Sequence, residues 1–122
     1  MEIERIECGP RMSQAVVAGG LVFLAGQVAR QNQAGDVQEQ AREVLARIDA
    51  LLQAAGSDRS RLVSATVWLV DMGDFRAFNE VWDAWVTPGA TPTRACVQAL
   101  LAQPQYKVEV AVVAGRQPTG PL

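Results

Sequence analysis

Residues 92–97, Pro-Thr-Arg-Ala-Cys-Val, place an arginine inside a segment that is otherwise typical of a buried β-strand. A second apolar segment, Val108-Glu109-Val110, carries a carboxylate in the same way. Side chains alternate between the two faces of a strand, so Arg94 and Cys96 share one face. A charge on a buried strand is unfavourable unless it is paired or faces a cleft. The two segments therefore indicate either a structural ion pair or a small anion-binding site.

The composition is that of one slightly acidic globular domain. Of 122 residues, 49% are hydrophobic and 20% are charged, and the net charge is −2. Nucleic-acid-binding proteins carry a basic patch or stripe, and none is visible here, so we expect no nucleic-acid partner. No apolar run is long enough to cross a bilayer, and the first residues do not form a signal peptide. We therefore expect a cytoplasmic protein that does not associate with membranes.

The absence of histidine restricts the chemistry that this chain can perform. It excludes Ser-His-Asp and Cys-His arrangements and argues against a histidine-dependent ribonuclease. The two cysteines, Cys8 and Cys96, lie far apart in the sequence and lack metal-ligand spacing. We expect no metal, no other cofactor, and two reduced thiols.

Hydrophobic periodicity predicts two helices and six strands. The clearest element is a helix at 37–55, which Asp36 and Glu39 begin with a capping box and Gly56 ends. The other predicted elements are strands at 3–7, 15–18, 21–25, 62–70, 93–100 and 107–114 and a helix at 74–86. Residues 117–122 form a Pro/Gly-containing tail that we expect to be disordered.

This element order predicts an α+β domain whose two helices cover one face of a sheet. The opposite face would then carry apolar side chains with nothing above them, including Phe23, Trp68, Val97 and Val113. An exposed apolar patch of this kind marks an interaction surface. The sequence therefore predicts self-association.

Seven short segments recur in the order and spacing of a known family. They are Gly9-Pro10 with Ser13-Gln14-Ala15, Leu24-Ala25-Gly26-Gln27, Ala54-Ala55-Gly56, Thr66-Val67-Trp68-Leu69-Val70-Asp71-Met72, Phe78-Asn79-Glu80-Val81-Trp82, Pro92-Thr93-Arg94-Ala95-Cys96-Val97 and Lys107-Val108-Glu109-Val110. Through these segments the chain resembles the RidA/YjgF family of small imine and enamine deaminases, formerly described as endoribonuclease L-PSP.

The resemblance covers nearly the whole chain and implies one domain spanning residues 1–122. It implies a chorismate-mutase-like fold with a mixed sheet and two helices on one face. It further implies a homotrimer in which the sheets pack into a central barrel and ligand clefts lie between subunits. The implied activity is hydrolysis of small 2-imino or 2-enamino carboxylic acids without a metal or cofactor.

Arg94 and Glu109 are the strongest candidates for catalytic residues. A guanidinium can hold a carboxylate through two parallel hydrogen bonds, and the resemblance implies that Arg94 binds the substrate carboxylate. A partly buried carboxylate tends to have a raised pKa, which suits a general acid or base. The resemblance implies that Glu109 positions or activates water. The alternatives are an ion pair between these residues, an ion pair of Arg94 with an interface acid, or a solvated Glu109 at a strand edge.

Two further residues are candidates for contact with the substrate. The resemblance places Cys96 in the pocket lining, and without a histidine to activate it we expect a buried, unreactive thiol. Asn79 falls between Phe75 and Trp82 on the apolar face of the second predicted helix, where a polar amide needs a partner. The resemblance places Asn79 beside the cleft between subunits. The alternative is an amide that bonds a loop backbone.

The sequence departs from the family at two candidate substrate-contacting positions. Met12 stands where the family deaminases carry a tyrosine, and Ala25 stands where they often carry a serine. Two hydroxyl groups that could orient substrate or water are therefore missing, whereas the arginine and the glutamate remain.

These observations leave two functions open. The first is RidA-like hydrolysis of small 2-imino acids to 2-oxo acids and ammonia. The second is a non-catalytic trimeric module, a sensor or a partner-protein module, that binds a small carboxylate such as a 2-oxo acid. Loops 29–35 and 87–92 are expected to shape the pocket and so to set its preference among substituents.

Overall fold

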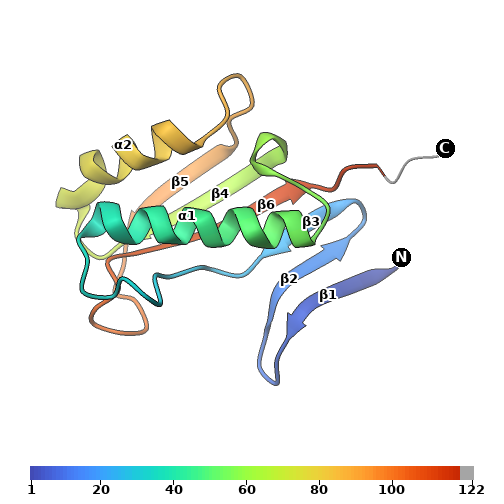
Figure 1. The fold of residues 1–122 in the computed structure, drawn as a ribbon, viewed down its shortest axis with the longest axis horizontal. Coiled ribbons are helices and arrows are strands. Elements are labelled where there is room, and N and C mark those ends of the chain that lie inside the picture. Colours follow the sequence, from blue (N-terminus) through green and yellow to red (C-terminus); the bar gives the residue numbers. More distant parts are fainter. Residues whose placement is uncertain (119–122) are drawn as a thin grey trace.

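The computed structural model describes residues 1–118 and contains a six-stranded sheet with two helices across one face (Figure 1). The strands are β1 (Ile3–Cys8), β2 (Ser13–Ala18), β3 (Leu21–Leu24), β4 (Leu62–Leu69), β5 (Thr93–Gln98) and β6 (Val108–Gly115). The helices are α1 (Val37–Ala54) and α2 (Phe75–Trp85). The predicted α+β class is confirmed.

The strand order is β1-β2-β3-β6-β4-β5. The β4–β5 pair is parallel and the other pairs are antiparallel, which confirms the predicted mixed sheet. A parallel pair needs a long crossover connection, and α2 lies within the segment that links β4 to β5. This topology places Glu109 on an inner strand and Arg94 on the strand at one edge of the sheet.

Both ends of α1 form as the sequence predicts. The Asp36 side chain accepts a hydrogen bond from the Glu39 backbone N–H at 2.9 Å, and Glu39 Oε1 accepts from the Asp36 backbone N–H at 3.1 Å. Gly56 follows the helix with φ +79°, a left-handed conformation that glycine adopts easily. Two short 3₁₀ helices, Arg59–Arg61 and Met72–Asp74, were not predicted, because three residues are too few to show a periodicity.

The core lies between the helices and the sheet and contains large, fully buried side chains from both layers. They include Leu45, Ile48, Leu52, Leu69 and Phe78. A polar cluster joins the two helices at the edge of this core. Asp49 accepts hydrogen bonds from Arg59 Nε at 3.2 Å, Arg59 NH2 at 2.7 Å and Trp85 Nε1 at 3.0 Å. These bonds hold α2 in place above β5.

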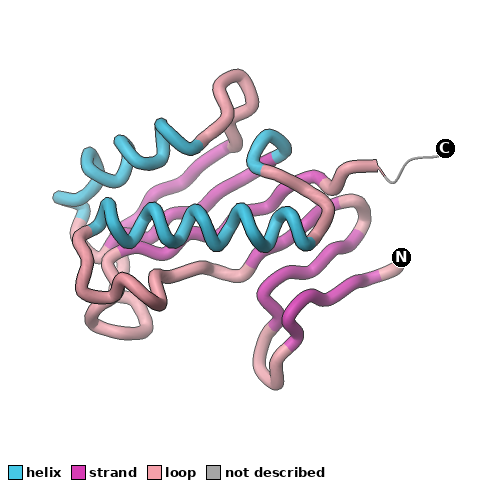
Figure 2. The backbone as a smooth tube through the Cα atoms, in the orientation of Figure 1, coloured by secondary structure: helices cyan, strands magenta, loops and turns pink. Residues whose placement is uncertain are grey.

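The opposite face of the sheet is not covered by any part of residues 1–118. Figure 2 shows both helices on the same side of the strands. On the other side, Phe23 and Val97 are each 43% exposed, and Trp68 and Val113 are half-buried. The predicted apolar surface is therefore present in the folded subunit.

Two predictions concern the termini and membranes. Residues 117–118 have no regular structure, and the rest of the predicted tail, residues 119–122, lies outside the described part of the chain. Neither of the described helices combines the length and the apolar character needed to span a bilayer.

Candidate functional site

Arg94 projects from the helix-covered side of the edge strand β5. The β4–β5 register aligns Arg94 with Ala65 and Cys96 with Val67, and both β4 residues are buried beneath the helices. Arg94 itself is half-buried. The strand alternation predicted for Arg94 and Cys96 is thus correct, and it directs both side chains toward α2.

Three aromatic rings of α2 surround the Arg94 guanidinium, and we call Phe75, Phe78 and Trp82 the aromatic cage. The guanidinium carbon lies 5.3 Å from the Trp82 ring centroid, 5.8 Å from that of Phe75 and 6.0 Å from that of Phe78. Phe78 and Trp82 are buried, whereas Phe75 is 40% exposed and forms the open side of the cage. Cation–π contacts stabilise the cation but supply no acceptor for its N–H groups.

One terminal nitrogen of Arg94 has no acceptor. NH1 is fully buried, and no group within residues 1–118 accepts a hydrogen bond from it. The ion pairs of the described chain join Asp49 to Arg59 and Glu4 to Arg116, so Arg94 takes part in neither. A charge held by rings and left without a counterion is suited to an incoming anion.

Cys96 lies beside Arg94 and behaves as a protonated thiol. Burial raises the pKa of Cys96 above its ordinary value, and the positive charge of Arg94 only partly offsets this effect. Thiolate is the reactive form of cysteine, so a raised pKa disfavours nucleophilic chemistry. This result favours the unreactive thiol over a nucleophile, and the role in lining the pocket stays a prediction.

Asn79 lies on the same face of α2 as the aromatic cage, four residues after Phe75 and three before Trp82. Its Oδ1 is buried and has no hydrogen-bond partner within residues 1–118. The structure therefore places Asn79 beside Arg94 and the aromatic cage, which together form the Arg94 cluster. No loop backbone N–H within residues 1–118 donates to this oxygen, which argues against the alternative of a bond to a loop backbone.

Glu109 lies on the other face of the sheet. The β4–β6 register aligns it with Trp68, whose side chain points away from the helices, whereas its neighbours Val108 and Val110 are fully buried beneath them. Burial raises the pKa of Glu109 above its ordinary value. Arg94 and Glu109 form no ion pair within one chain, and the alternative of a structural ion pair between them does not hold there.

Gly26 makes room for the Glu109 carboxylate. A Cβ added at Gly26 would lie 1.9 Å from Glu109 Oε2 and 2.9 Å from its carboxyl carbon. Gln27, the next residue, pairs with Val110 through two backbone hydrogen bonds of 2.8 and 3.1 Å. The carboxylate therefore packs directly against the main chain of the segment 25–27.

A buried glutamine, for which the sequence predicted no role, holds this segment. Gln27 Nε2 donates to Gln14 Oε1 at 2.8 Å and to the Ala25 carbonyl at 3.1 Å. Gln27 Oε1 accepts from Arg47 Nε of α1 at 3.2 Å. Gln14 and Gln27 both fall within the recurring segments, and this could have marked them as functional residues. Their contact, however, depends on the β2–β3 pairing.

The Gly26→Ala variant should displace the Glu109 carboxylate while the fold is retained. The colliding atoms are the far end of a flexible side chain, which can move at little energetic cost. Misplacing a catalytic group by about 1 Å can reduce a rate by about 100-fold. If Glu109 acts as a catalytic residue, a turnover that depends on it should fall by about 10- to 100-fold, measured beside thermal unfolding. In a Glu109→Ala background the same change should leave the melting temperature unaffected. Equal destabilisation in both backgrounds would contradict the proposed collision.

Met12 and Ala25 belong to different surroundings. Ala25 precedes Gly26, so it lies near Glu109, as expected for a residue that stands in the place of a water-orienting serine. Met12 lies in the β1–β2 turn, where it is 47% exposed and its carbonyl accepts from the Gly9 N–H at 2.9 Å. Within one chain, neither is grouped with the Arg94 cluster.

The two loops expected to shape the pocket are held in different ways. Glu43 of α1 accepts hydrogen bonds from the backbone N–H groups of Arg30, Gln31 and Asn32 at 2.7 to 3.2 Å, which fixes loop 29–35. Partial desolvation acts to raise the pKa of Glu43, but these hydrogen bonds outweigh it and the pKa is lowered. Loop 87–92 leads directly into β5 and so lies next to the Arg94 cluster.

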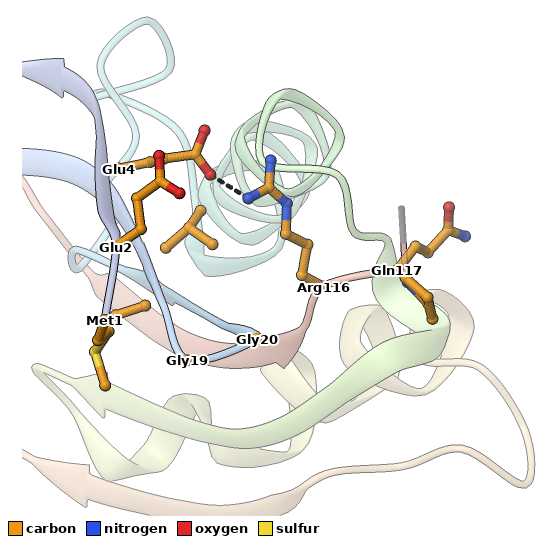
Figure 3. Close-up of a pocket in the computed structure, with 10 residues that line it drawn as sticks. Met1, Glu2, Glu4, Gly19, Gly20, Arg116 and Gln117 are labelled. Carbon is orange, nitrogen blue, oxygen red and sulfur yellow. Dashed lines mark hydrogen bonds and ion pairs between the residues drawn. The ribbon is translucent and has the colours of Figure 1, made fainter. Parts of the chain in front are cut away.

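A cavity of about 480 Å³ lies elsewhere, between the N-terminal residues, the β2–β3 turn and the segment after β6 (Figure 3). Glu4 and Arg116 form an ion pair at its wall. It contains none of the predicted site residues. Across residues 1–118, no three His, Cys, Asp or Glu side chains gather closely enough to hold a metal ion.

Comparison with known proteins supports the fold and the family resemblance. The family described as Endoribonuclease L-PSP matches residues 2–115. The RutC family protein YoaB of Escherichia coli K12 is 42% identical over 114 residues, which are 93% of this chain and 98% of that protein. A RutC family protein of Haemophilus influenzae is 40% identical, over 93% of this chain and 98% of its own. A crystal structure of a YjgF family protein from Neisseria meningitidis superposes with a TM-score of 0.94 at 44% identity, covering 98% of each chain. The chain therefore belongs to the Endoribonuclease L-PSP family, the group of proteins also called RidA/YjgF and RutC.

Proposed function

We propose that this protein hydrolyses small 2-imino or 2-enamino carboxylic acids to 2-oxo acids and ammonia. The observation that supports this most directly is the Arg94 guanidinium, which is held by aromatic rings and has no counterion within residues 1–118. Such a cation matches the carboxylate that all these substrates share. Glu109, with a pKa raised by burial, supplies a carboxylate that accepts a proton more readily than an exposed one.

In the proposed reaction, Arg94 holds the carboxylate and backbone groups near Cys96 hold the nitrogen of the protonated imine. A water oxygen bonds to C2 as the π electrons of the C=N bond move to nitrogen, and one water proton passes to the Glu109 carboxylate. Glu109 then returns this proton to nitrogen. The C–N bond breaks and ammonia leaves with the bonding electrons as the C=O bond forms, and the C2 hydroxyl proton passes through Glu109 to ammonia, which becomes ammonium. The products are a 2-oxo acid and ammonium.

Two subunits are needed for this reaction. Arg94 and Glu109 lie on opposite faces of the sheet, so one small substrate cannot contact both within a single chain. Glu109 lies on the exposed apolar face, and Arg94 lies on the edge strand. We propose that the exposed apolar face of one subunit packs against its neighbour. This packing brings Arg94 of one subunit to Glu109 of another, in the homotrimer that the family resemblance implies.

We expect the purified protein to be a homotrimer at micromolar concentration. Burial of Phe23, Val97 and their neighbours supplies the driving force, at about 25 cal/mol per Å² of apolar surface. Light scattering coupled to size exclusion, or analytical ultracentrifugation, measures the mass directly. Phe23→Glu should shift the mass toward the monomer. A wild-type protein that is a stable monomer would overturn both the trimer and the shared site.

Mixed trimers test where the two residues meet. Arg94→Ala and Glu109→Gln chains are each expected to form inactive trimers. If the site combines Arg94 of one subunit with Glu109 of the next, random co-assembly restores both residues at about a quarter of the sites. Co-refolded mixtures should therefore regain about a quarter of wild-type activity. No recovery from mixtures shown to contain both chains would mean that each subunit supplies both residues.

The missing hydroxyl groups favour the alternative of a non-catalytic module that binds a small carboxylate. The decisive assay generates imino acids in situ from several amino acids with an amino-acid oxidase and follows 2-oxo acid release above the uncatalysed rate. Pyruvate binding is measured in parallel by calorimetry. We expect weak turnover that Met12→Tyr increases, because a lost orienting donor reduces a rate by about 10- to 100-fold. Pyruvate binding without turnover of any imino acid would instead establish the non-catalytic module.

A further inference from the structure

The described chain contains two buried side-chain atoms that lack a hydrogen-bond partner, Asn79 Oδ1 and Arg94 NH1. One is an acceptor and the other is a donor. Leaving such a group unsatisfied costs about 1–3 kcal/mol, and most buried polar groups in proteins are paired. The two atoms come from α2 and β5, which face each other around the aromatic cage.

The periodicity of α2 places Asn79 on the side of the helix that faces Arg94. The Arg94 guanidinium carbon lies 5.8 Å from the Phe75 ring centroid and 5.3 Å from that of Trp82. Asn79 stands between these two residues on the same helical stripe. A guanidinium that reaches both rings therefore extends along the part of the helix that carries the amide.

Other partners for this nitrogen are weaker or too distant. The neighbouring Cys96 offers a thiol, which is a weak acceptor, and its pKa is raised by burial. Among residues 1–118, the ion-paired carboxylates are Asp49 and Glu4, which bind other arginines, and Glu109 lies on the opposite face of the sheet. Unlike a carboxylate, the Asn79 side chain is a neutral amide.

We propose that Asn79 is a positioning residue for Arg94. The two unpaired atoms are not bonded to each other in the subunit alone. When a carboxylate binds, Asn79 Oδ1 accepts a hydrogen bond from Arg94 NH1 and fixes the plane of the guanidinium, so that the remaining N–H groups face the ligand. Because the amide is neutral, Arg94 keeps its full charge for the incoming carboxylate. This inference rests on the proposed role of Arg94 in carboxylate binding.

Binding of pyruvate and of its uncharged amide, pyruvamide, separates this role from a structural one. Asn79→Leu removes the acceptor at similar size and should weaken pyruvate binding by about 10-fold, the value of one hydrogen bond to a charged group. Asn79→Asp should also weaken pyruvate binding, because the new carboxylate neutralises Arg94, and lowering the pH should restore it. Pyruvamide binding should change little in either variant. Asp83→Asn, on the exposed side of α2, is the matched control and should have no effect.

The coupling between the two residues gives the decisive result. Arg94→Lys keeps a positive charge but has no NH1, so adding Asn79→Leu to it should weaken pyruvate binding no further. A full additional 10-fold loss in that background would overturn the proposal, as would unchanged pyruvate binding by Asn79→Leu. Unchanged binding by Arg94→Ala would instead overturn the carboxylate site itself.

Measurements on the wild-type protein cover the case in which the leucine variant does not fold. NMR of the Arg94 guanidinium should show slowed rotation of its terminal nitrogens when pyruvate is added, because NH1 is then held by Asn79. Free rotation in the pyruvate complex would contradict the proposed hydrogen bond.

Discussion

Arg94→Ala is expected to abolish binding of small carboxylates while the subunit stays folded and assembled. The guanidinium makes no ion pair within residues 1–118, so its removal breaks no ion pair within the subunit. Removing one partner of a desolvated charged contact costs about 2–5 kcal/mol. At 1.4 kcal/mol per factor of ten, the dissociation constant for pyruvate should rise by about 30- to 4,000-fold. Calorimetric titration of wild type and variant measures this change.

Two controls separate ligand binding from structural support. Arg76→Ala removes an exposed cation at the start of the same helix and should leave pyruvate binding unchanged. The mass and the melting temperature of each variant report assembly and fold. If Arg94→Ala loses its assembly while each folded molecule binds pyruvate as wild type does, then Arg94 is a structural residue.

Glu109→Gln should reduce turnover by about 100-fold or more, the usual contribution of a positioned acid or base. Glutamine keeps the shape of the side chain, so its contact with Gly26 is retained. Pyruvate affinity should change little, because the carboxylate of the ligand is held by Arg94. Imino-acid turnover and pyruvate titration on the same preparations measure both effects. Turnover equal to wild type would show that Glu109 does not activate water.

The pH dependence gives a second, independent measure of Glu109. Burial raises its pKa, and the ionised form is the one that accepts the proton of water. Wild-type turnover should therefore rise with pH through this raised pKa, and the rise should be absent in Glu109→Gln.

The stability of the fold should change with pH in the opposite direction to turnover. A raised folded-state pKa contributes stability at low pH that is lost as the pH rises through it, so Glu109→Gln should gain stability over wild type in that range. The exposed Glu2→Gln change is the matched control for both profiles.

Local signals in the sequence were sufficient for the elements of this fold. The capping box of Asp36 and Glu39 and the glycine at position 56 set the ends of α1, because caps depend on residues within a few positions of each other. Phe75 was expected on the buried face of α2 but is 40% exposed, since it lies at the first turn, where the helix leaves the core and borders the aromatic cage.

The sequence was sufficient to predict the α+β class, the uncovered apolar face and the candidate residues. It also determined that Arg94 and Cys96 share a face, because alternation within one strand has a fixed period of two. It could not show whether a residue on one strand and a residue on another lie on the same side of the sheet. That relation depends on register, and a shift of one residue would move Glu109 to the other face.

The grouping of the candidate residues depends on the three-dimensional fold. Strand β4 aligns Ala65 with Arg94 and Trp68 with Glu109, and these β4 residues point to opposite faces of the sheet. The same register places Arg94 against the rings of α2 and Glu109 against Gly26. These contacts join segments that are distant in the chain, and they are set by packing and strand pairing rather than by any local preference of the residues involved.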